Sequence, residues 1–381
     1  MDIKDIRALI AQMTLEEKAG LCSGADFWHT KAVERLGIPA TMVSDGPHGL
    51  RKQDEAADHL GVNDSIEAVC FPAACATAAS FDKALVNGMG RAIGESCQHE
   101  KLSVVLGPAV NIKRSPLCGR NFEYLSEDPY LAGELAAAYI NGVQSQNVGT
   151  SIKHFAANNQ ETNRQRVEER IPERALREIY LPAFRAAVEE GGVWTVMSAY
   201  NKINGTECAL NRWLLTDLLR DEWGFKGFVV SDWGAAYDRA AALAAGNDLE
   251  MPGPQDPAQL LQAIEDGCVA AILCQAVHHV IEARARGHHG IDVDFALDHE
   301  FEHAGPALVL RNVDRRAYGA FDVLAPGDPL AVACMRLGKL DEVGRVDGAL
   351  CSRLVARPRA FVVAVHAGHC IVLLVEQLLP L

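Results

Sequence analysis

The chain has 381 residues, of which 49% are hydrophobic, and its formal net charge is −14 at pH 7. This length accommodates one large α/β barrel or two modest domains, and the hydrophobic share supports a large buried core. The negative charge argues against nucleic acid or an anionic membrane as a partner. No run of about 18 or more apolar residues predicts a membrane span.

Cysteine usage and the N-terminus bear on the compartment. The 11 cysteines are scattered and include no CxxC pair, which predicts reduced intracellular thiols rather than a disulfide framework or a zinc site. The first residues, Met1 to Asp5, lack the basic and apolar regions of a signal peptide. We therefore expect a cytoplasmic protein.

Short apolar strands alternate with helices along the first two thirds of the chain. The first helix is predicted over residues 5–20, with Thr14 as a candidate N-cap. The first strand covers residues 40–44, and the polar stretch from Arg51 to Glu67 predicts a loop over the site. Further helices are expected over 82–100, 130–146, 173–190 and 212–222, and further strands over 103–106, 149–152, 194–198 and 227–232, with a long loop over 111–129.

This alternation with short links predicts a parallel sheet, and the number of units favours a (β/α)8 TIM-type barrel. An open doubly wound sheet is the alternative. No GxGxxG or Walker loop follows any strand, so nothing supports nucleotide binding.

The pattern changes after about residue 267. Eight of the 13 histidines lie beyond residue 270, and residues 268–360 show no clean periodicity. Residues 371–381 are apolar again. We expect a barrel over residues 1–267, followed by a divergent segment over 268–360 whose fold the sequence does not predict.

The strand that ends at Asp232 presents a carboxylate followed by the aromatic Trp233. Carboxyl ends of strands carry the chemistry in barrels and doubly wound folds. Glycoside cleavage passes through an oxocarbenium-like state, which a carboxylate below the anomeric carbon stabilises or attacks. Catalysis by Asp232 is therefore one hypothesis, and an N-cap for a helix starting near Ala235 is the other.

Two further strand ends carry polar residues. Asp45 lies in Ser-Asp-Gly-Pro, where it could accept sugar hydroxyls or form an Asx-turn. Lys153 and His154 follow a short strand, and burial of an unpaired ammonium is costly. Lys153 is therefore expected to face a carboxylate or a hydroxyl-rich ligand, the alternative being a surface lysine beside a core histidine.

The remaining candidates lie on loops and on the fourth strand. Arg120 offers forked donors that suit vicinal hydroxyls or a carboxylate, although a surface ion pair is the alternative. Met197 and Tyr200 could line the apolar face of a sugar, with core packing equally open for Met197. Further polar candidates after the third strand are Asn158, Asn159, Arg164 and Arg166.

Together these segments resemble glycoside hydrolase family 3, and within it the bacterial β-glucosidases. The similar motifs are Ser-Asp-Gly-Pro-His-Gly (44–49), Gly-Arg-Asn-Phe-Glu-x-x-Ser-Glu-Asp-Pro (119–129), Lys-His-Phe (153–155), Val-Met-Ser-Ala-Tyr-Asn-Lys-Ile-Asn-Gly (196–205) and Ser-Asp-Trp (231–233). Met-Thr-Leu-Glu-Glu-Lys (13–18), Cys-Ser-Gly-Ala-Asp-Phe-Trp-His-Thr (22–30) and Leu-Glu-Met-Pro-Gly-Pro (249–254) fit too. The resemblance covers roughly residues 8–267 in the family's order.

The resemblance implies a (β/α)8-type barrel and exo-acting, retaining hydrolysis of terminal β-D-glucosyl residues, without a metal or organic cofactor. It implies that Asp232 is the nucleophile and Trp233 a wall of the first sugar subsite. It also implies that the sugar hydroxyls are bound by Asp45, Arg120, Lys153 and His154, with Met197 and Tyr200 nearby. The expected partner is a β-glucoside or a short oligosaccharide.

One part of the family pattern is missing. A retaining glycosidase needs a second carboxyl group about 5 Å from the nucleophile. In the family's β-glucosidases this acid/base is a glutamate of a second α/β-sandwich domain, and we expect that domain to be missing here because the remaining residues are too few for it. Another subgroup uses a His and an Asp on the loop after Lys-His-Phe, and residues 156–161 contain no histidine.

Residues 361–381 resemble the family's link toward that second domain, so we expect a truncated barrel without its acid/base. Glu300 and Glu302 lie in an acidic stretch whose surroundings do not argue for a substitute acid. We expect such a barrel to associate either with the missing second-domain segment or with further copies of itself, as a homo-oligomer. The alternatives in function are a catalytically impaired sugar-binding barrel and a related exo-glycosidase such as a β-xylosidase.

Overall fold

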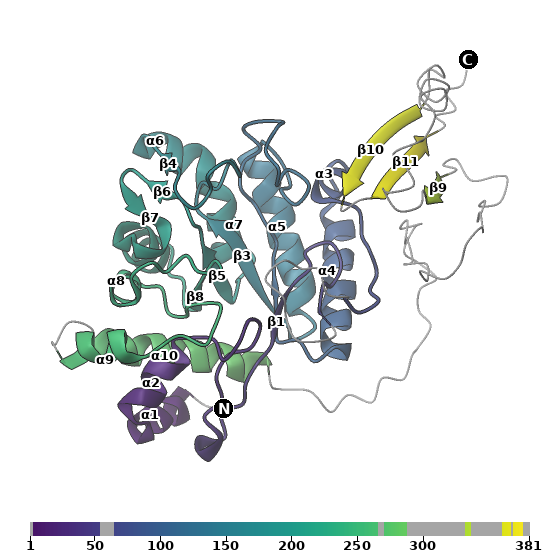
Figure 1. Ribbon diagram of the computed structural model, residues 1–381. Helices are drawn as coiled ribbons and strands as arrows, with labels where there is room; N and C mark the ends of the chain where they lie inside the picture. Colours follow the sequence, from purple (N-terminus) through teal and green to yellow (C-terminus); the bar gives the residue numbers. More distant parts are fainter. Residues whose placement is uncertain are drawn as a thin grey trace. The chain divides into compact units, whose positions relative to one another are not determined.

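The computed structural model describes residues 3–53, 65–265, 270–287, 332–336, 360–366 and 369–375. The chain divides into two compact units, Met1–Asn312 and Val313–Leu381. The first unit contains the predicted strands and helices (Figure 1). None of the described helices is both long and apolar enough to cross a membrane.

A parallel sheet of five strands forms the centre of the first unit. In spatial order the strands are β1 (Val43–Asp45), β2 (Val104–Leu106), β3 (Gly149–Phe155), β5 (Thr195–Ser198) and β8 (Phe228–Ser231). Each strand pairs in parallel with the strand before it in the sheet. The spatial order follows the chain order without a reversal, whereas a doubly wound sheet reverses at a switch point. The strand order therefore supports the barrel over the doubly wound alternative.

Short bridged segments close this sheet on itself. The bridges join Val230 to Leu249 and Ser23 to Glu250 in parallel, and Gly24 to Thr30 and His29 to Met42 antiparallel. The backbone N–H of Val43 also donates to the carbonyl of Trp28 at 2.9 Å. Residues 249–250, 23–24 and 29–30 thus lead from β8 back to β1, and the predicted TIM-type barrel is confirmed.

Helices α4 (Lys83–His99), α5 (Pro129–Gln144) and α7 (Pro182–Glu189) lie side by side along the sheet (Figure 1). The close approach of α4 and α5 depends on Gly142, because a Cβ there would lie 2.2 Å from the carbonyl oxygen of Asn87. The packed helices cover the outer face of the barrel.

Side-chain caps set where these helices begin. Asp82 accepts from the N–H groups of Ala84 and Leu85 at the start of α4, and Asp128 accepts from Tyr130 N at the start of α5. The helices predicted over 82–100 and 130–146 are confirmed with these small changes of boundary.

Two predicted helices are interrupted. The stretch 5–20 forms α1 (Ile3–Gln12) and α2 (Leu15–Leu21), because Thr14 caps α2 through a capping box with Glu17. The stretch 173–190 divides into α6 (Glu173–Ala175), a π-helical segment η2 (Leu176–Tyr180) and α7, which starts at Pro182. Proline lacks the N–H that would continue the preceding helical turn. Both predictions were wrong in treating these stretches as single helices.

The other elements of the first unit are short. They are η1 (Glu34–Leu36), α3 (Ala74–Ala78), η3 (Cys208–Leu210), the π-helical η4 (Trp213–Glu222), α8 (Arg239–Ala245), α9 (Ala258–Glu265) and a small sheet of β4 (Glu168–Glu169), β6 (Lys202–Ile203) and β7 (Thr206–Glu207). The segment η4 matches the helix predicted over 212–222. The small sheet, η1, α3, η3 and α9 were not predicted, and α8 begins at Arg239 rather than near Ala235.

Helix α10 (Ala270–Gly287) lies beyond the predicted barrel limit at residue 267. Its apolar residues Leu273, Val277 and Ile281 share a buried cluster with Ile6 and Ile10 of α1. Helix α10 therefore packs on the first unit, and the domain limit itself stays a prediction.

The second unit contains β9 (Val332–Arg336), β10 (Ala360–His366) and β11 (His369–Val375), which form an antiparallel sheet in the order β10-β11-β9. The divergent segment 268–360 and the link over 361–381 stay predictions. Glu300 and Glu302 lie outside the described residues.

Candidate active site

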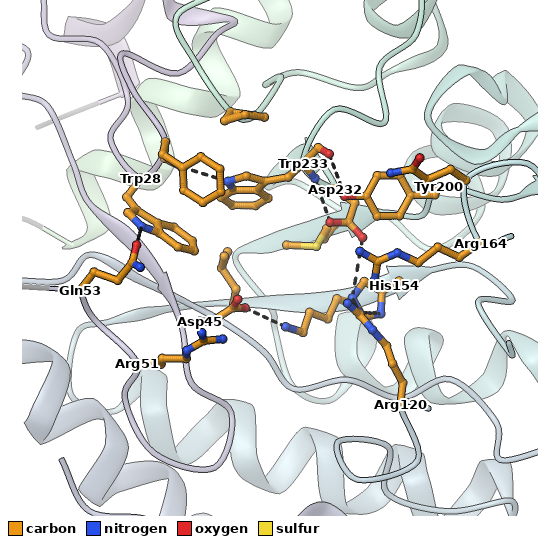
Figure 2. A pocket seen from close by; sticks show the side chains of 16 residues that line it. Trp28, Asp45, Arg51, Gln53, Arg120, His154, Arg164, Tyr200, Asp232 and Trp233 are labelled. Carbon is orange, nitrogen blue, oxygen red and sulfur yellow. Dashed lines mark hydrogen bonds and ion pairs between the residues drawn. The ribbon is translucent and has the colours of Figure 1, made fainter. Parts of the chain in front are cut away.

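A cavity of about 460 Å³ opens where the parallel strands end (Figure 2). It is lined by Phe27, Trp28, Asp45, Arg51, Gln53, Leu106, Arg120, Lys153, His154, Arg164, Gln165, Met197, Tyr200, Asp232, Trp233 and Pro252. All eight residues that the sequence singles out for the site are among them. The structure thus brings these candidates together, and their individual roles remain proposals.

Asp232 follows the last residue of β8 and is 8% exposed. Its Oδ1 accepts from the backbone N–H of Trp233 at 2.8 Å, and its Oδ2 has no hydrogen-bond partner among the described residues. The next helix, α8, is capped by Asp238 instead. The helix-cap alternative for Asp232 is therefore wrong.

The surroundings of Asp232 disfavour its ionised form. Burial raises the pKa of this carboxyl above its ordinary value, and the nearby guanidinium of Arg120 and the N–H of Trp233 offset only part of that effect. A buried carboxylate with one free oxygen facing a cavity is weakly solvated. Such an oxygen is suited to attack an electrophilic carbon.

Lys153 is the buried cation of the site, with a side chain only 6% exposed. Its Nζ donates to Asp45 Oδ1 at 3.0 Å and lies 3.5 Å from Glu123 Oε2. The expectation that Lys153 faces a carboxylate is confirmed. Burial alone would lower the pKa of Lys153, but the two carboxylates raise it; burial would raise the pKa of Asp45, but Lys153 lowers it.

His154 lies beside Lys153 and is also buried. Its backbone is held by Asn111, whose Oδ1 accepts from His154 N and whose Nδ2 donates to His154 O, both at 2.8 Å. Burial, together with the charges of Arg120 and Lys153, holds the pKa of His154 well below its ordinary value. The imidazole is therefore neutral and can both donate to and accept from sugar hydroxyls.

Arg120 reaches the cavity from the long loop before α5. Its side chain is 20% exposed, lies within hydrogen-bond distance of the His154 ring, and pairs with Glu123 Oε1 at 3.2 Å and Glu161 Oε1 at 3.3 Å. The alternative of a surface ion pair is wrong, because Arg120 lines the cavity and is mostly buried.

Aromatic rings form the opposite side of the cavity (Figure 2). The ring centroids of Trp233 and Trp28 are 5.4 Å apart, and those of Trp233 and Phe27 are 6.2 Å apart. Trp233 is fixed at both ends, since its Nε1 donates to Phe27 O at 3.0 Å and its carbonyl accepts from Tyr200 OH at 2.7 Å. Met197 lines the cavity and also belongs to a buried apolar cluster, so both interpretations of Met197 apply.

Sequence reasoning missed several lining residues. Phe27 and Trp28 lie in the quoted motif 22–30, where two adjacent aromatic residues were an available signal. Arg51 and Gln53 begin the stretch predicted to be a loop over the site, of which residues 54–64 lie outside the described residues. Of the further polar candidates, Arg164 lines this cavity and Asn159 lines a second cavity of about 410 Å³.

The residues present do not suggest a metal site. Among the described residues, no group of three or more His, Cys, Asp or Glu side chains is placed to hold a metal ion. The cations of the cavity instead form ion pairs, Lys153 with Asp45 of the lining and Arg120 with Glu123 outside it. What the arrangement offers chemically is a buried carboxylate, fixed hydrogen-bonding groups and an aromatic surface, which together suit a pyranose ring.

Comparison with known proteins connects this site to a family. Residues 14–283 match the family model described as the glycosyl hydrolase family 3 N terminal domain. The chain is 57% identical over 282 residues to thermostable β-glucosidase B of Acetivibrio thermocellus, covering 73% of this chain and 37% of that protein. It is 55% identical over 261 residues to an exo-α-(1→6)-L-arabinopyranosidase of Bifidobacterium longum, covering 68% of this chain and 34% of that protein.

Solved structures show the same relation. The β-glucosidase of Bifidobacterium adolescentis matches with a TM-score of 0.71 and 50% identity, over 75% of this chain and 41% of that chain. β-Glucosidase 3B of Thermotoga neapolitana, in complex with α-D-glucose, matches with a TM-score of 0.70 and 40% identity, over 74% of this chain and 42% of that chain. The chain thus spans about two fifths or less of the length of these relatives.

Proposed function

Because the chain belongs to glycosyl hydrolase family 3, we propose that its barrel carries the sugar-binding site and the nucleophile of a retaining, exo-acting β-glucosidase. The observation that carries this proposal is the free Oδ2 of buried Asp232 at the edge of a cavity with fixed polar groups and an aromatic wall. Relatives named β-glucosidases, and a matching structure that contains glucose, support it.

In this proposal Asp232 Oδ2 attacks the anomeric carbon of a terminal β-glucosyl residue. The bond to the leaving oxygen breaks, its electron pair departs with that oxygen, and a glycosyl ester of Asp232 remains until water hydrolyses it. Asp45, Lys153 and His154 would bind the ring hydroxyls, because their ion pairs and backbone bonds fix them in place before the substrate arrives. Trp233 would pack on the apolar face of the ring.

The proton for the leaving oxygen has no evident source in this cavity. Among the described lining residues, the carboxyl groups are those of Asp45 and Asp232. Lys153 lowers the pKa of Asp45 and so keeps it ionised, and the pKa of Lys153 is itself raised. We propose that this chain does not supply the acid/base, so that it favours substrates whose leaving group needs little protonation.

The test is covalent labelling with a 2-deoxy-2-fluoro-β-glucoside that carries dinitrophenolate. The fluorine slows hydrolysis of the glycosyl ester, and the leaving group needs no acid, so the label reports the nucleophile alone. The expected result is one fluoroglucosyl group on the peptide that contains Asp232. It should be absent from Asp232→Asn and present in Asp221→Asn, a control at an exposed position before β8.

Two other outcomes would overturn parts of the proposal. A label on another residue would refute the nucleophile assignment. Failure to label, together with measurable glucose binding, would instead favour the catalytically impaired sugar-binding barrel.

A related exo-glycosidase is the second candidate, since a relative named an arabinopyranosidase is nearly as similar as the one named a β-glucosidase. The name of the second relative specifies exo action and a pyranose. Parallel kinetics with nitrophenyl β-D-glucopyranoside, β-D-xylopyranoside and α-L-arabinopyranoside would rank the three sugars. A higher kcat/KM for either pentoside than for the glucoside would overturn the preference for glucose.

A further inference from the structure

Six charged side chains of alternating sign form a continuous chain along one side of the cavity, which we call the charge chain. In order it contains Asp45, Lys153, Glu123, Arg120, Glu161 and Arg164, with N···O distances of 3.0, 3.5, 3.2, 3.3 and 3.0 Å between successive members. Each charge therefore has at least one opposite neighbour, and the sum of the six charges is zero.

The members of the charge chain divide into two groups. Asp45, Lys153, Arg120 and Arg164 line the cavity, whereas Glu123 and Glu161 are not among its lining residues. Glu161 lies behind the two arginines and borders the second cavity instead. It is thus placed to act on the site through its neighbours rather than by touching a ligand there.

Glu161 is the only described carboxylate whose ion pairs join these two arginines. Its Oε1 lies 3.3 Å from Arg120 Nε, and its Oε2 accepts from Arg164 Nη1 at 3.0 Å. Asn158 Nδ2 donates to the same carboxylate at 3.3 Å and also to the buried Tyr124 OH at 3.0 Å. The Glu161 carboxylate thus accepts a hydrogen bond from a buried amide and forms ion pairs with two guanidiniums.

We propose that Glu161 is a positioning residue that restrains the guanidiniums of Arg120 and Arg164 beside Asp232, so that neither forms a direct ion pair with the nucleophile or enters the space that the sugar needs. The inference rests on the proposed function, because Asp232 matters here as the nucleophile. Figure 2 shows Arg120, Arg164 and His154 gathered beside Asp232.

The physical reason is competition between two carboxylates for the same cations. The Oδ2 atom of Asp232 has no hydrogen-bond partner among the described residues. It is therefore the acceptor in the cavity to which a guanidinium that loses its ion pair with Glu161 would donate. A guanidinium prefers a forked pair with a carboxylate. Removal of the Glu161 charge would therefore draw Arg120 and Arg164 toward Asp232.

Arg164 links this effect to the aromatic wall. Its guanidinium lies 4.9 Å from the ring centroid of Tyr200, and Tyr200 OH donates to the carbonyl of Trp233. A shift of Arg164 would remove a cation–π contact from the residue that anchors Trp233. Glu161 thus supports both the polar and the aromatic side of the site without lining it.

The test compares Glu161→Gln with Glu178→Gln, which removes the partner of the exposed Arg174 on a surface helix. For Glu161→Gln we expect glucose affinity and kcat/KM for dinitrophenyl β-glucoside to fall by about ten- to a hundredfold, as for a small misplacement of binding groups. Glu161→Asp should recover part of the loss, because it keeps the charge. Glu178→Gln should match the parent chain.

The pH profile separates positioning from a loss of fold. Guanidiniums that move toward Asp232 favour its ionised form, so the acidic limb of kcat/KM should move to lower pH in Glu161→Gln. A variant that is less stable to heat but has the parent's KM, glucose affinity and acidic limb would overturn the inference.

Failure of the proposed function would be distinguishable. If the parent chain binds glucose and takes the fluoroglucosyl label, and Glu161→Gln does both equally well, only the positioning role falls. If the parent chain neither binds glucose nor takes the label, the proposed function and this inference fall together.

Discussion

The Oδ2 atom of Asp232 and the Nε2 atom of His154 lie 3.9 Å apart, and that oxygen of Asp232 has no hydrogen-bond partner among the described residues. His154 is neutral because burial and the adjacent cations hold its pKa well below the ordinary value. The imidazole therefore does not neutralise the carboxylate. Burial raises the pKa of Asp232, and Arg120, the N–H of Trp233, Arg164 and Lys153 offset that effect only in part.

The first prediction concerns the pH dependence of turnover. A nucleophilic carboxylate must be ionised, so activity is present above the pKa of Asp232 and is lost as the pH falls through it. Burial raises that pKa above the ordinary 3.8, so the acidic limb of kcat/KM for dinitrophenyl β-glucoside should lie above this value. Initial rates from acidic to neutral pH measure the limb, and a limb below 3.8 would contradict the assignment.

The second prediction is that Asp232→Asn stabilises the fold while it abolishes labelling. A carboxyl whose pKa is raised by folding contributes stability below its unfolded pKa, and that contribution is lost as the pH rises through the folded pKa. At neutral pH the parent chain therefore carries the cost of a buried charge, which asparagine removes. In thermal unfolding at neutral pH, the Tm of Asp232→Asn should lie a few degrees above that of the parent chain, and this difference should shrink in acid.

The third prediction concerns the buried cation. Lys153→Met leaves Asp45 without its 3.0 Å partner and leaves Glu123 with Arg120 alone. The Asp45 side chain is 38% exposed, so water screens that pair in part, whereas the Glu123 side chain is 6% exposed. The loss should therefore be smaller than the about 3–5 kcal/mol that removal of one partner from a fully buried pair costs. Urea unfolding should show this loss, and glucose binding should be lost as well.

A matched control is Lys83→Met, which breaks the exposed pair with Glu134. Exposed pairs contribute little, so this variant should unfold with the parent chain. Equal effects of the two substitutions would show that burial does not decide the strength of these pairs.

The strand ends were predictable because each combines a short apolar run with polar residues directly after it. That pattern predicted that Asp45, Lys153 and Asp232 lie at one end of the sheet. The parallel register of β5 and β8, which pairs Ser198 with Ser231, explains why residues far apart in sequence converge there. Buried parallel strands leave a clear signal in the sequence.

The supporting residues were not predictable in the same way. Glu161 follows the strand by several residues on a loop, and its value comes from Arg120 and Arg164, which are 41 and 3 positions away in the sequence. No periodicity marks such a pairing. The break at Thr14 was not predictable for a different reason, because the residues on both sides of this cap have helical patterns and the sequence does not separate α1 from α2.

The fourth prediction tests the anchor of the aromatic wall. Tyr200→Phe removes the hydroxyl that donates to Trp233 O at 2.7 Å, and a lost hydrogen bond of this kind costs about 1 kcal/mol. We expect a comparable loss of stability and up to about a tenfold rise in KM, since 1.4 kcal/mol corresponds to tenfold in affinity. Tyr130→Phe, at an exposed position, is the control; a KM change as large there would refute the anchor.

The fifth prediction follows from the acid–base character of the cavity. A proton donor for the leaving oxygen needs a pKa near the working pH, yet Lys153 keeps Asp45 ionised, and the pKa of Lys153 is itself raised. His154 is already neutral, and its pKa is too low for it to carry the proton. The described cavity therefore holds a nucleophile without a matched acid.

We expect dinitrophenyl β-glucoside to be turned over much faster than nitrophenyl β-glucoside, and cellobiose slowest of the three. Rates plotted against the pKa of the leaving phenol should fall steeply. A flat dependence, with cellobiose cleaved as readily as the activated phenyl glucosides, would show that the chain supplies its own acid and that the donor lies in the residues beyond the described cavity.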